Sequence, residues 1–177
     1  MNELLTNFVT LNASLLSVAI SFLLFGYIFL DKFKPLKFEL FEWFPDPQIV
    51  FEFYLDGLSG VMMVLISTLS LVIQLFSTSY MSKDEKYTKY FEYFNFFVFS
   101  MLLLVMSGNF LVMFFGWELV GLSSYLLISF WSEKKSASKA GSKAFILNRI
   151  GDFGFLIGLM MILNYFETFN FLSIFED

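Results

Sequence analysis

The chain has no cysteine and no histidine among its 177 residues. Its own side chains can therefore hold no disulfide, no thiolate-bound zinc or iron–sulfur cluster and no histidine-ligated haem. Charged residues make up only 15% of the sequence, and the net charge of -5 provides no basic stripe for a nucleic acid. We expect neither a metal site nor a cofactor site in this chain, and no nucleic-acid partner.

Hydrophobic residues, in contrast, make up 58% of the chain, and the mean hydropathy is +0.72. This composition is far more apolar than that of a soluble domain, and a membrane-spanning helix needs about 20 mainly apolar residues. Five segments meet this need: Asn12 to Leu30, Gly57 to Tyr80, Phe91 to Ser107, Asn109 to Trp131, and Lys143 to Phe166. The sequence therefore predicts an all-α transmembrane fold of about five antiparallel helices, forming a single domain over residues 1–177.

Two connecting segments have patterns of their own. Residues 31–56 contain two aromatic-rich runs, Phe38 to Phe44 and Ile49 to Leu55, separated by Pro45-Asp46-Pro47. This arrangement favours a short β-hairpin on the membrane surface, and an irregular amphipathic loop fits it about as well. Between the third and fourth spans, the turn-forming residues 107–109 predict a tight reversal and hence a helical hairpin.

Lysines are distributed unevenly between the two ends of the predicted bundle. Six lie in the loops Met81 to Tyr90 and Ser132 to Ser142, on the side of the N-terminus, whereas the other side has three among several acids. By the positive-inside rule, the N-terminus and these loops face the cytoplasm or the matrix. Residues 1–10 contain no Lys or Arg and so resemble neither a secretory signal nor a transit peptide. The 27 Phe and 3 Pro favour an organelle-encoded gene.

Three charged residues lie well away from the ends of the predicted spans. Glu118 is ten residues into the fourth span, and Arg149 and Asp152 lie in the fifth. Each such ion costs about 2.5 to 3.5 kcal/mol on insertion scales, so these side chains must face protein or water and are candidates for function. Arg149 and Asp152 share a helix face, on which Asn148 extends the polar stripe. Glu118 has no partner on its own helix and needs a cation from another one.

Two interpretations of these charges remain open. In the functional one, two acids share one arginine, so one carboxylate is always under-compensated and is the group that exchanges a proton. In the structural one, Glu118 forms a fixed ion pair with Arg149, and Asp152 is hydrogen-bonded and inert.

Small and aromatic residues near the charges predict helix packing. Gly154-Phe-Leu-Ile-Gly158 fits the pattern of closely packed membrane helices, and Gly116 with Gly121 suits tight contact in the preceding span. Trp117 and Tyr125 fit either packing or the lining of a pathway, and Trp131 fits an anchor at the membrane interface.

Three motifs together resemble one known family. Residues 114–128, which read FFGWELVGLSSYLLI, resemble the glutamate-bearing helix of NADH dehydrogenase subunit 5, the distal antiporter-like subunit of respiratory complex I. Asp56-Gly-Leu-Ser-Gly60 and residues 143–154, KAFILNRIGDFG, match the same family in the same order and at similar spacing. The resemblance runs from about Phe51 to the C-terminus.

This resemblance implies that Glu118 is the key glutamate of the N-terminal half-channel, with Arg149 and Asp152 as the neighbouring charged pair. The chain would be a proton-translocating membrane-arm subunit of NADH:ubiquinone oxidoreductase, whose FMN, iron–sulfur clusters, NADH and ubiquinone are bound elsewhere in the complex. Its expected location is the mitochondrial inner membrane, with the N-terminus on the matrix side; a bacterial plasma membrane is the alternative.

The family begins with one more helix and continues for many helices beyond Asp177. We therefore expect the N-terminal part of an antiporter-like fold, encoded by a split gene, with a second chain carrying the later lysine-bearing helices. A truncated chain is the alternative explanation. Other membrane-arm subunits and membrane lipid are the expected partners.

Two further functions are considered. The large subunit of a multisubunit sodium/proton antiporter is similar and shares the buried glutamate, although the sequence around Glu118 is closer to the respiratory subunit. A structural subunit that no longer conducts protons is the other. The retained charges argue against it, because a purely structural chain could replace them with apolar residues.

Overall fold

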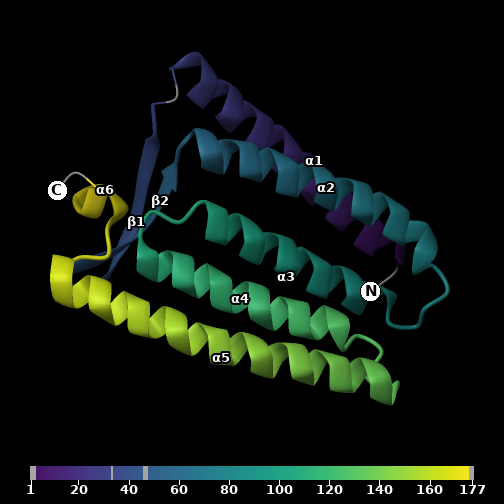
Figure 1. The fold of residues 1–177 in the computed structure, drawn as a ribbon. Coiled ribbons are helices and arrows are strands. Elements are labelled where there is room, and N and C mark those ends of the chain that lie inside the picture. The colour runs from purple at the N-terminus through teal and green to yellow at the C-terminus, as the bar shows by residue number, and fades with distance from the viewer. Residues whose placement is uncertain (1–2, 33, 46–47, 176–177) are drawn as a thin grey trace.

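The computed structural model describes residues 3–32, 34–45 and 48–175. Figure 1 shows five long helices side by side, with two strands across one end of the row and a short helix beside them. In chain order the elements are α1 (Glu3–Leu30), β1 (Leu36–Pro45), β2 (Gln48–Leu55), α2 (Gly57–Tyr80), α3 (Tyr87–Val105), α4 (Phe110–Ile128), α5 (Lys135–Phe166) and α6 (Phe171–Phe175). The predicted helical membrane architecture with a small hairpin is confirmed.

Three helices begin before the spans that hydropathy marks. α3 begins at Tyr87 rather than Phe91, so the predicted loop Met81 to Tyr90 ends earlier than expected. α1 begins at Glu3 rather than Asn12, and α5 begins at Lys135 rather than Lys143. The prediction of a loop as far as Ser142 is therefore wrong. In α5 the polar residues before the apolar stretch include Lys and Ala, which are strong helix formers and let the helix begin earlier than hydropathy indicates.

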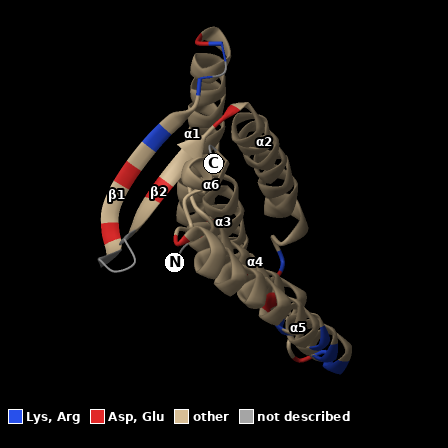
Figure 2. Ribbon diagram, turned by 60° about the vertical axis from the view of Figure 1, so that its left-hand side comes forward, with Lys and Arg blue, Asp and Glu red and all other residues tan. Residues whose placement is uncertain are grey.

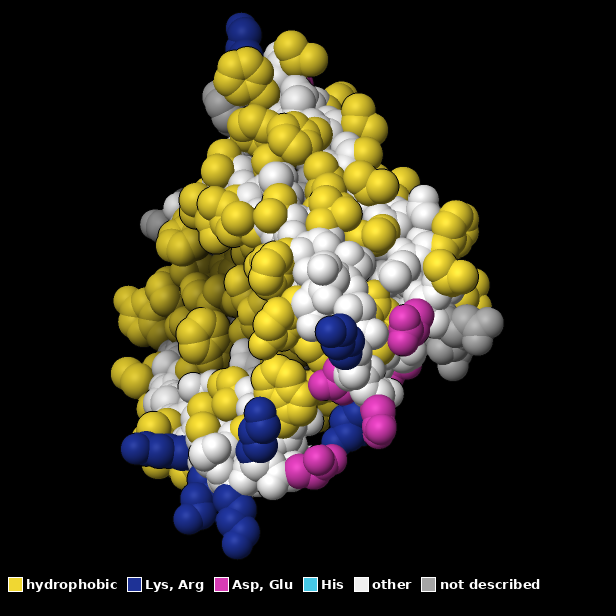
Figure 3. Space-filling model, turned by 90° about the vertical axis from the view of Figure 1, so that its right-hand side faces the viewer, with side chains coloured by type: hydrophobic (Ala, Val, Ile, Leu, Met, Phe, Trp, Pro, Cys, Tyr) yellow, Lys and Arg dark blue, Asp and Glu magenta, His cyan; other side chains and the backbone are white. Residues whose placement is uncertain are grey.

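Within the described residues, four helices, α1, α2, α4 and α5, are long and apolar enough to cross a membrane. The helix α3 coincides with the predicted third span but is not among them, since it carries Lys89, Glu92 and Asn95 in its first half. Its spanning role stays a prediction. Figure 3 shows one face of the molecule, where hydrophobic side chains cover a broad surface above charged groups at its lower end. Exposed apolar area on this scale is expected of a surface that meets lipid or another membrane chain.

The segment between α1 and α2 forms an antiparallel hairpin, so the alternative of an irregular loop is wrong. Leu36 of β1 lies opposite Leu55 of β2, and the register shifts twice along the pair. The rings of Phe41 and Phe51 stack across the strands with centroids 5.3 Å apart. Trp43 meets the ring of Phe115 on α4 edge-on at 5.7 Å, which fixes the hairpin against the bundle. Asp46 and Pro47, which the sequence places at the turn, lie outside the described residues.

The predicted reversal between α3 and α4 is confirmed, and it also holds the hairpin. The N–H of Gly108 donates to the carbonyl oxygen of Glu52 at 3.0 Å. A Cβ atom at Gly108 would lie 2.7 Å from Cγ of Glu52, so only glycine fits without a shift. Asn109 caps α4 by accepting from the N–H of Val112 at 2.9 Å and donates its amide to the carbonyl of Val50 at 2.8 Å.

The start of α1 and the two lysine-rich loops meet at the opposite end of the bundle. Thr6 hydrogen-bonds to Thr88 at 3.2 Å, and Lys86 pairs with Glu133 at 2.6 Å. Figure 2 shows Lys and Arg gathered near the beginning of α5 and acids along the strands at the other end. The charge asymmetry behind the predicted orientation is thus a feature of the fold, while the compartment that each end faces stays a prediction.

Candidate functional site

The position of Glu118 is set by the start of α4 and by its close contact with α3. The Asn109 cap fixes where α4 begins, and Glu118 then lies in its middle. A Cβ atom at Gly116 would lie 2.8 Å from Cα of Leu104 and 2.9 Å from its backbone nitrogen. The backbones of α3 and α4 are therefore in close contact two residues before Glu118, as the glycine at this position predicts.

The structure brings all three predicted charges together between α4 and α5. Nη1 of Arg149 contacts Oε2 of Glu118 and lies 3.6 Å from Oδ2 of Asp152. Asp152 is 6% exposed, whereas the side chain of Arg149 is 42% exposed. The cation that Glu118 needs thus comes from α5, and one guanidinium nitrogen serves two acids. The contacts show this arrangement; a role in proton transfer stays a prediction.

The remaining contacts of the cluster come from aromatic and amide side chains. The guanidinium of Arg149 lies over the ring of Phe145, 4.7 Å from its centroid, and Phe145 packs on Tyr125 at 5.4 Å. A cation over an aromatic face is attracted by the ring quadrupole, so Phe145 helps to hold Arg149. Asn148 approaches Gly121 of α4, in agreement with the polar stripe predicted for α5.

The sequence did not identify Trp117 as a partner of the charges. Its indole Nε1–H donates to Oδ1 of Asp152 at 2.8 Å. The sequence indicated only packing or the lining of a pathway for Trp117. The sequence did contain a signal for this contact. Buried carboxylates are nearly always hydrogen-bonded, so Asp152 needs a donor besides Arg149, and the tryptophan that immediately precedes Glu118 carries one.

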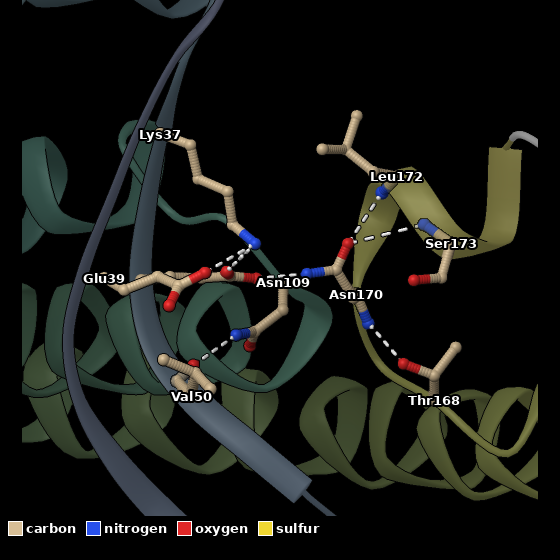
Figure 4. Close-up of polar contacts among 9 residues, drawn as sticks. Lys37, Glu39, Val50, Asn109, Thr168, Asn170, Leu172 and Ser173 are labelled. Carbon is tan, nitrogen blue, oxygen red and sulfur yellow. Dashed lines mark hydrogen bonds and ion pairs between the residues drawn. The ribbon is translucent and has the colours of Figure 1, made fainter.

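A second polar cluster lies at the hairpin end, and sequence analysis missed it as well. Glu52 is 2% exposed, although it lies in a strand between aromatic residues, and it pairs with Lys37 at 2.9 Å. Asn170 donates its amide to Oε1 of the same carboxylate at 2.5 Å, and Lys37 also reaches Glu39 at 3.0 Å. Figure 4 shows how Lys37, Glu39 and Asn170 approach one another from β1 and from the segment after α5.

This cluster borders a polar cavity of about 300 Å³ that Asn109 and Thr168 also line. The contacts of Lys37 with Glu52, and to a lesser extent with Glu39, raise the pKa of its amine above the ordinary value of 10.5. The cluster ties three segments together, since Phe110 at the start of α4 also donates its N–H to the carbonyl of Phe169 at 3.0 Å. We assign it to the attachment of the hairpin rather than to the charges between α4 and α5.

At the lysine-rich end, the loops are joined by charge-assisted contacts. Nε1–H of Trp131 donates to Oδ2 of Asp84 at 2.9 Å, and this hydrogen bond is the main reason why the pKa of Asp84 lies below 3.8. Lys86 and Glu133 pair across the same two loops, which raises the pKa of Lys86 and lowers that of Glu133.

Comparison with known families and proteins gives one consistent result. Residues 43–91 match the family described as the N-terminus of chain 5 of NADH-ubiquinone oxidoreductase (complex I), and residues 107–177 match the family described as the membrane domain of NADH:quinone oxidoreductases and Mrp antiporters. The first match begins within β1, earlier than Phe51.

The chain is also similar to individual members over most of its length. It is 43% identical over 162 residues to NADH-quinone oxidoreductase subunit L of Neisseria meningitidis serogroup B, which covers 86% of this chain and 24% of the relative. It is 44% identical over 124 residues to NADH-ubiquinone oxidoreductase chain 5 of Acanthamoeba castellanii, covering 70% of this chain and 18% of the relative. The chain thus spans about a quarter or less of these relatives.

A solved structure shares the fold. A chain of the membrane-bound sulfane sulfur reductase, an archaeal respiratory membrane complex, superposes with a TM-score of 0.80 at 21% identity, covering 93% of this chain and 33% of that one.

Proposed function

Because the chain belongs to the family of antiporter-like membrane subunits that NADH:quinone oxidoreductases share with Mrp antiporters, we propose that it carries part of a proton path in the membrane arm of a respiratory NADH:ubiquinone oxidoreductase. One observation carries this proposal: Arg149 is shared by Glu118 and Asp152 in the middle of two apolar helices. In this proposal Glu118 is the proton carrier of the N-terminal half-channel.

The energetics of the membrane support a functional role. Three charges at this depth cost roughly 2.5 to 3.5 kcal/mol each on insertion scales, and a purely structural helix contact can be made with apolar side chains instead. With one cation for two acids, full ionisation leaves a net negative charge in the cluster. A change in the position of Arg149 alters which acid it compensates, and this is the step by which Glu118 takes up or releases a proton.

The described residues leave one side of this site open, which supports further partners. The side chain of Arg149 is 42% exposed, and Cβ atoms at Gly151, Gly154 and Gly158 would meet nothing within 4 Å. The predicted glycine packing on α5 therefore has no counterpart within the described part of the chain. The remainder of the antiporter-like fold is the natural occupant of this face, together with other membrane-arm subunits.

The redox chemistry belongs to other subunits in this proposal. FMN, the iron–sulfur clusters, NADH and ubiquinone bind elsewhere in the complex, and this chain couples electron transfer to proton movement. The membrane is the mitochondrial inner membrane, with the lysine-rich end of the bundle in the matrix. Native gels and mass spectrometry of the chain extracted in mild detergent test the assembly: co-purification with other NADH dehydrogenase subunits supports it.

A second candidate function is part of a sodium/proton antiporter, since the description of the family matched by residues 107–177 includes Mrp antiporters. Co-purification with sodium/proton antiporter subunits, and proton movement that follows a sodium gradient without electron transfer, would favour this candidate over the respiratory one.

The direct test of the carrier role is Glu118→Gln, which keeps the size and hydrogen-bonding capacity of the side chain but removes its titration. We expect the complex to assemble while proton pumping and coupled electron transfer fall. Glu167→Gln, at the exposed end of α5, is the matched control and leaves both unchanged. Normal pumping in Glu118→Gln, measured by the quenching of a pH-sensitive dye in sealed vesicles, would refute the carrier role.

Arg149→Ala tests the pairing itself. It strands two carboxylates in the bundle, and removing one partner of a buried pair costs about 3–5 kcal/mol, an upper value here because Arg149 is partly exposed. We expect a loss of assembled complex on native gels that exceeds the loss in Glu118→Gln. Lys143→Ala removes a cation near the start of the same helix and serves as control. Unchanged assembly and activity in Arg149→Ala would mean that the pairing is not needed.

A further inference from the structure

The acid next to Arg149 is held by a donor outside the charged cluster. Asp152 places Oδ1 2.8 Å from the indole nitrogen of Trp117 and Oδ2 3.6 Å from Arg149. A carboxylate that gave both oxygens to the guanidinium would form the bidentate pair that arginine and aspartate favour. Asp152 instead turns one oxygen towards α4, and Nη1 of Arg149, which stays 3.6 Å from the other oxygen of Asp152, makes its closer contact with Glu118.

Trp117 and Glu118 are adjacent in the sequence, and each affects, in a different way, how Arg149 is shared between the two acids. Glu118 competes with Asp152 for Arg149, and Trp117 draws Asp152 away from Arg149. Both residues are carried by the same turn of α4, directly after the close contact at Gly116. A small rotation or translation of α4 therefore changes both contacts at once, which suits a group that must alternate between two charge states.

We propose that Trp117 is a positioning residue of the proton path: its N–H, on α4, holds the carboxylate of Asp152 from α5 and thereby reserves Arg149 for Glu118. This inference rests on the proposed function, since it assigns to Trp117 the control of the charge that Glu118 meets. The ring of Trp117 also packs edge-on against Phe155 of α5 at 6.2 Å, so its orientation is fixed by α5 itself.

A phenylalanine at this position keeps the ring contact and removes the donor. Hydrogen bonds to charged groups favour the bound geometry by roughly tenfold or more. In Trp117→Phe we therefore expect Asp152 to move onto Arg149, with a roughly tenfold loss of the proton-pumping rate and an unchanged KM for quinone. The chain contains its own control: Trp131 donates the same kind of hydrogen bond to Asp84 in the loops, so Trp131→Phe removes an indole–carboxylate contact without touching the cluster.

A spectroscopic readout separates a positioning role from a packing role. The infrared carboxyl band of Asp152, assigned by its loss in Asp152→Asn, should shift in Trp117→Phe and stay in place in Trp131→Phe. Because Trp117 acts through Asp152, the double variant Trp117→Phe/Asp152→Asn should pump no worse than Asp152→Asn alone. If Trp117→Phe fails to assemble, benzothienylalanine at position 117 keeps the bicyclic shape and lacks only the N–H.

The outcomes distinguish this inference from the proposed function. A pumping loss in Glu118→Gln with normal pumping in Trp117→Phe would overturn the positioning role and leave the carrier role standing. An unshifted Asp152 band, or additive losses in the double variant, would also overturn it. Normal pumping in both Glu118→Gln and Trp117→Phe would overturn the carrier role and the positioning role together, even if the Asp152 band shifts.

Discussion

Replacing Gly116 by alanine is the sharpest test of how the fold places the charged cluster. The added Cβ would lie 2.8 Å from Cα of Leu104 and 2.9 Å from its nitrogen. Both are backbone atoms, so no side chain can turn away and α3 itself must move. Overpacking of this kind costs typically about 1–3 kcal/mol, and the better helix propensity of alanine offsets about 1 kcal/mol of it. We expect a net loss of roughly 0–2 kcal/mol relative to wild type, and of roughly 1–3 kcal/mol relative to a glycine-to-alanine change in open space.

The measurement is thermal unfolding of the complex in mild detergent, followed by the loss of the assembled species. Gly26→Ala is the matched control, because it makes the same change in α1 at a position where a Cβ meets nothing within 4 Å. We expect Gly116→Ala to melt several degrees lower than Gly26→Ala, and Gly26→Ala to melt at the temperature of wild type or higher. Equal melting temperatures for the two variants would refute the close helix contact from which the position of Glu118 is derived.

Two predictions concern the ends of the bundle. Lys37→Met leaves the buried carboxylate of Glu52 without its cation. We expect a loss of stability of about 1–3 kcal/mol, which is less than for a fully buried pair because the side chain of Lys37 is 37% exposed. Hydrogen exchange in β1 and β2 should be faster. The double variant Lys37→Met/Glu52→Gln should recover much of this protection, and no recovery would mean that the ion pair is incidental. Trp131→Phe removes the hydrogen bond that keeps the pKa of Asp84 below 3.8. A carboxyl group whose pKa is lowered by folding stabilises the fold at pH values above its unfolded pKa, and this stabilisation is lost as the pH falls through its folded pKa. At pH 7, proteolysis of the loop between α2 and α3 should therefore be faster in Trp131→Phe than in wild type. This difference should vanish well below pH 3.8.

The convergence of the charges between α4 and α5 could be predicted because the membrane makes charge expensive. A lone glutamate in an apolar helix must find a cation, and the sequence offers Arg149 as the only one in the interior of a predicted span, since Lys143 stands at the first position of the fifth span. The spacing of Arg149 and Asp152 then places both on one face of α5. These arguments need only burial and helix geometry, which the hydropathy of the chain already supplies.

The role of Glu52 could not be predicted in the same way. In the sequence it is one of several acids in a connecting segment, where acids are normally solvated. Its burial depends on the reversal at Gly108, which binds its backbone, and on Asn170, which lies 118 positions further along the chain. No local pattern encodes a contact at that separation, because it forms only after α3, α4 and α5 have aligned the ends of the bundle.

Trp117 was missed for a different reason, which bears on how the site works. A tryptophan in a membrane helix is easily explained by packing, and half of this ring is indeed exposed in the described structure. What distinguishes it is the imbalance of the cluster: two acids, one arginine, and a need for one further donor. A neutral donor can supply that contact without fixing the charge of the site, whereas a second cation would hold both acids ionised permanently. In the proposed role, an indole rather than a lysine completes the cluster because Glu118 has to change its protonation, whereas an ion pair that served only to join α4 and α5 would have no need of a neutral donor.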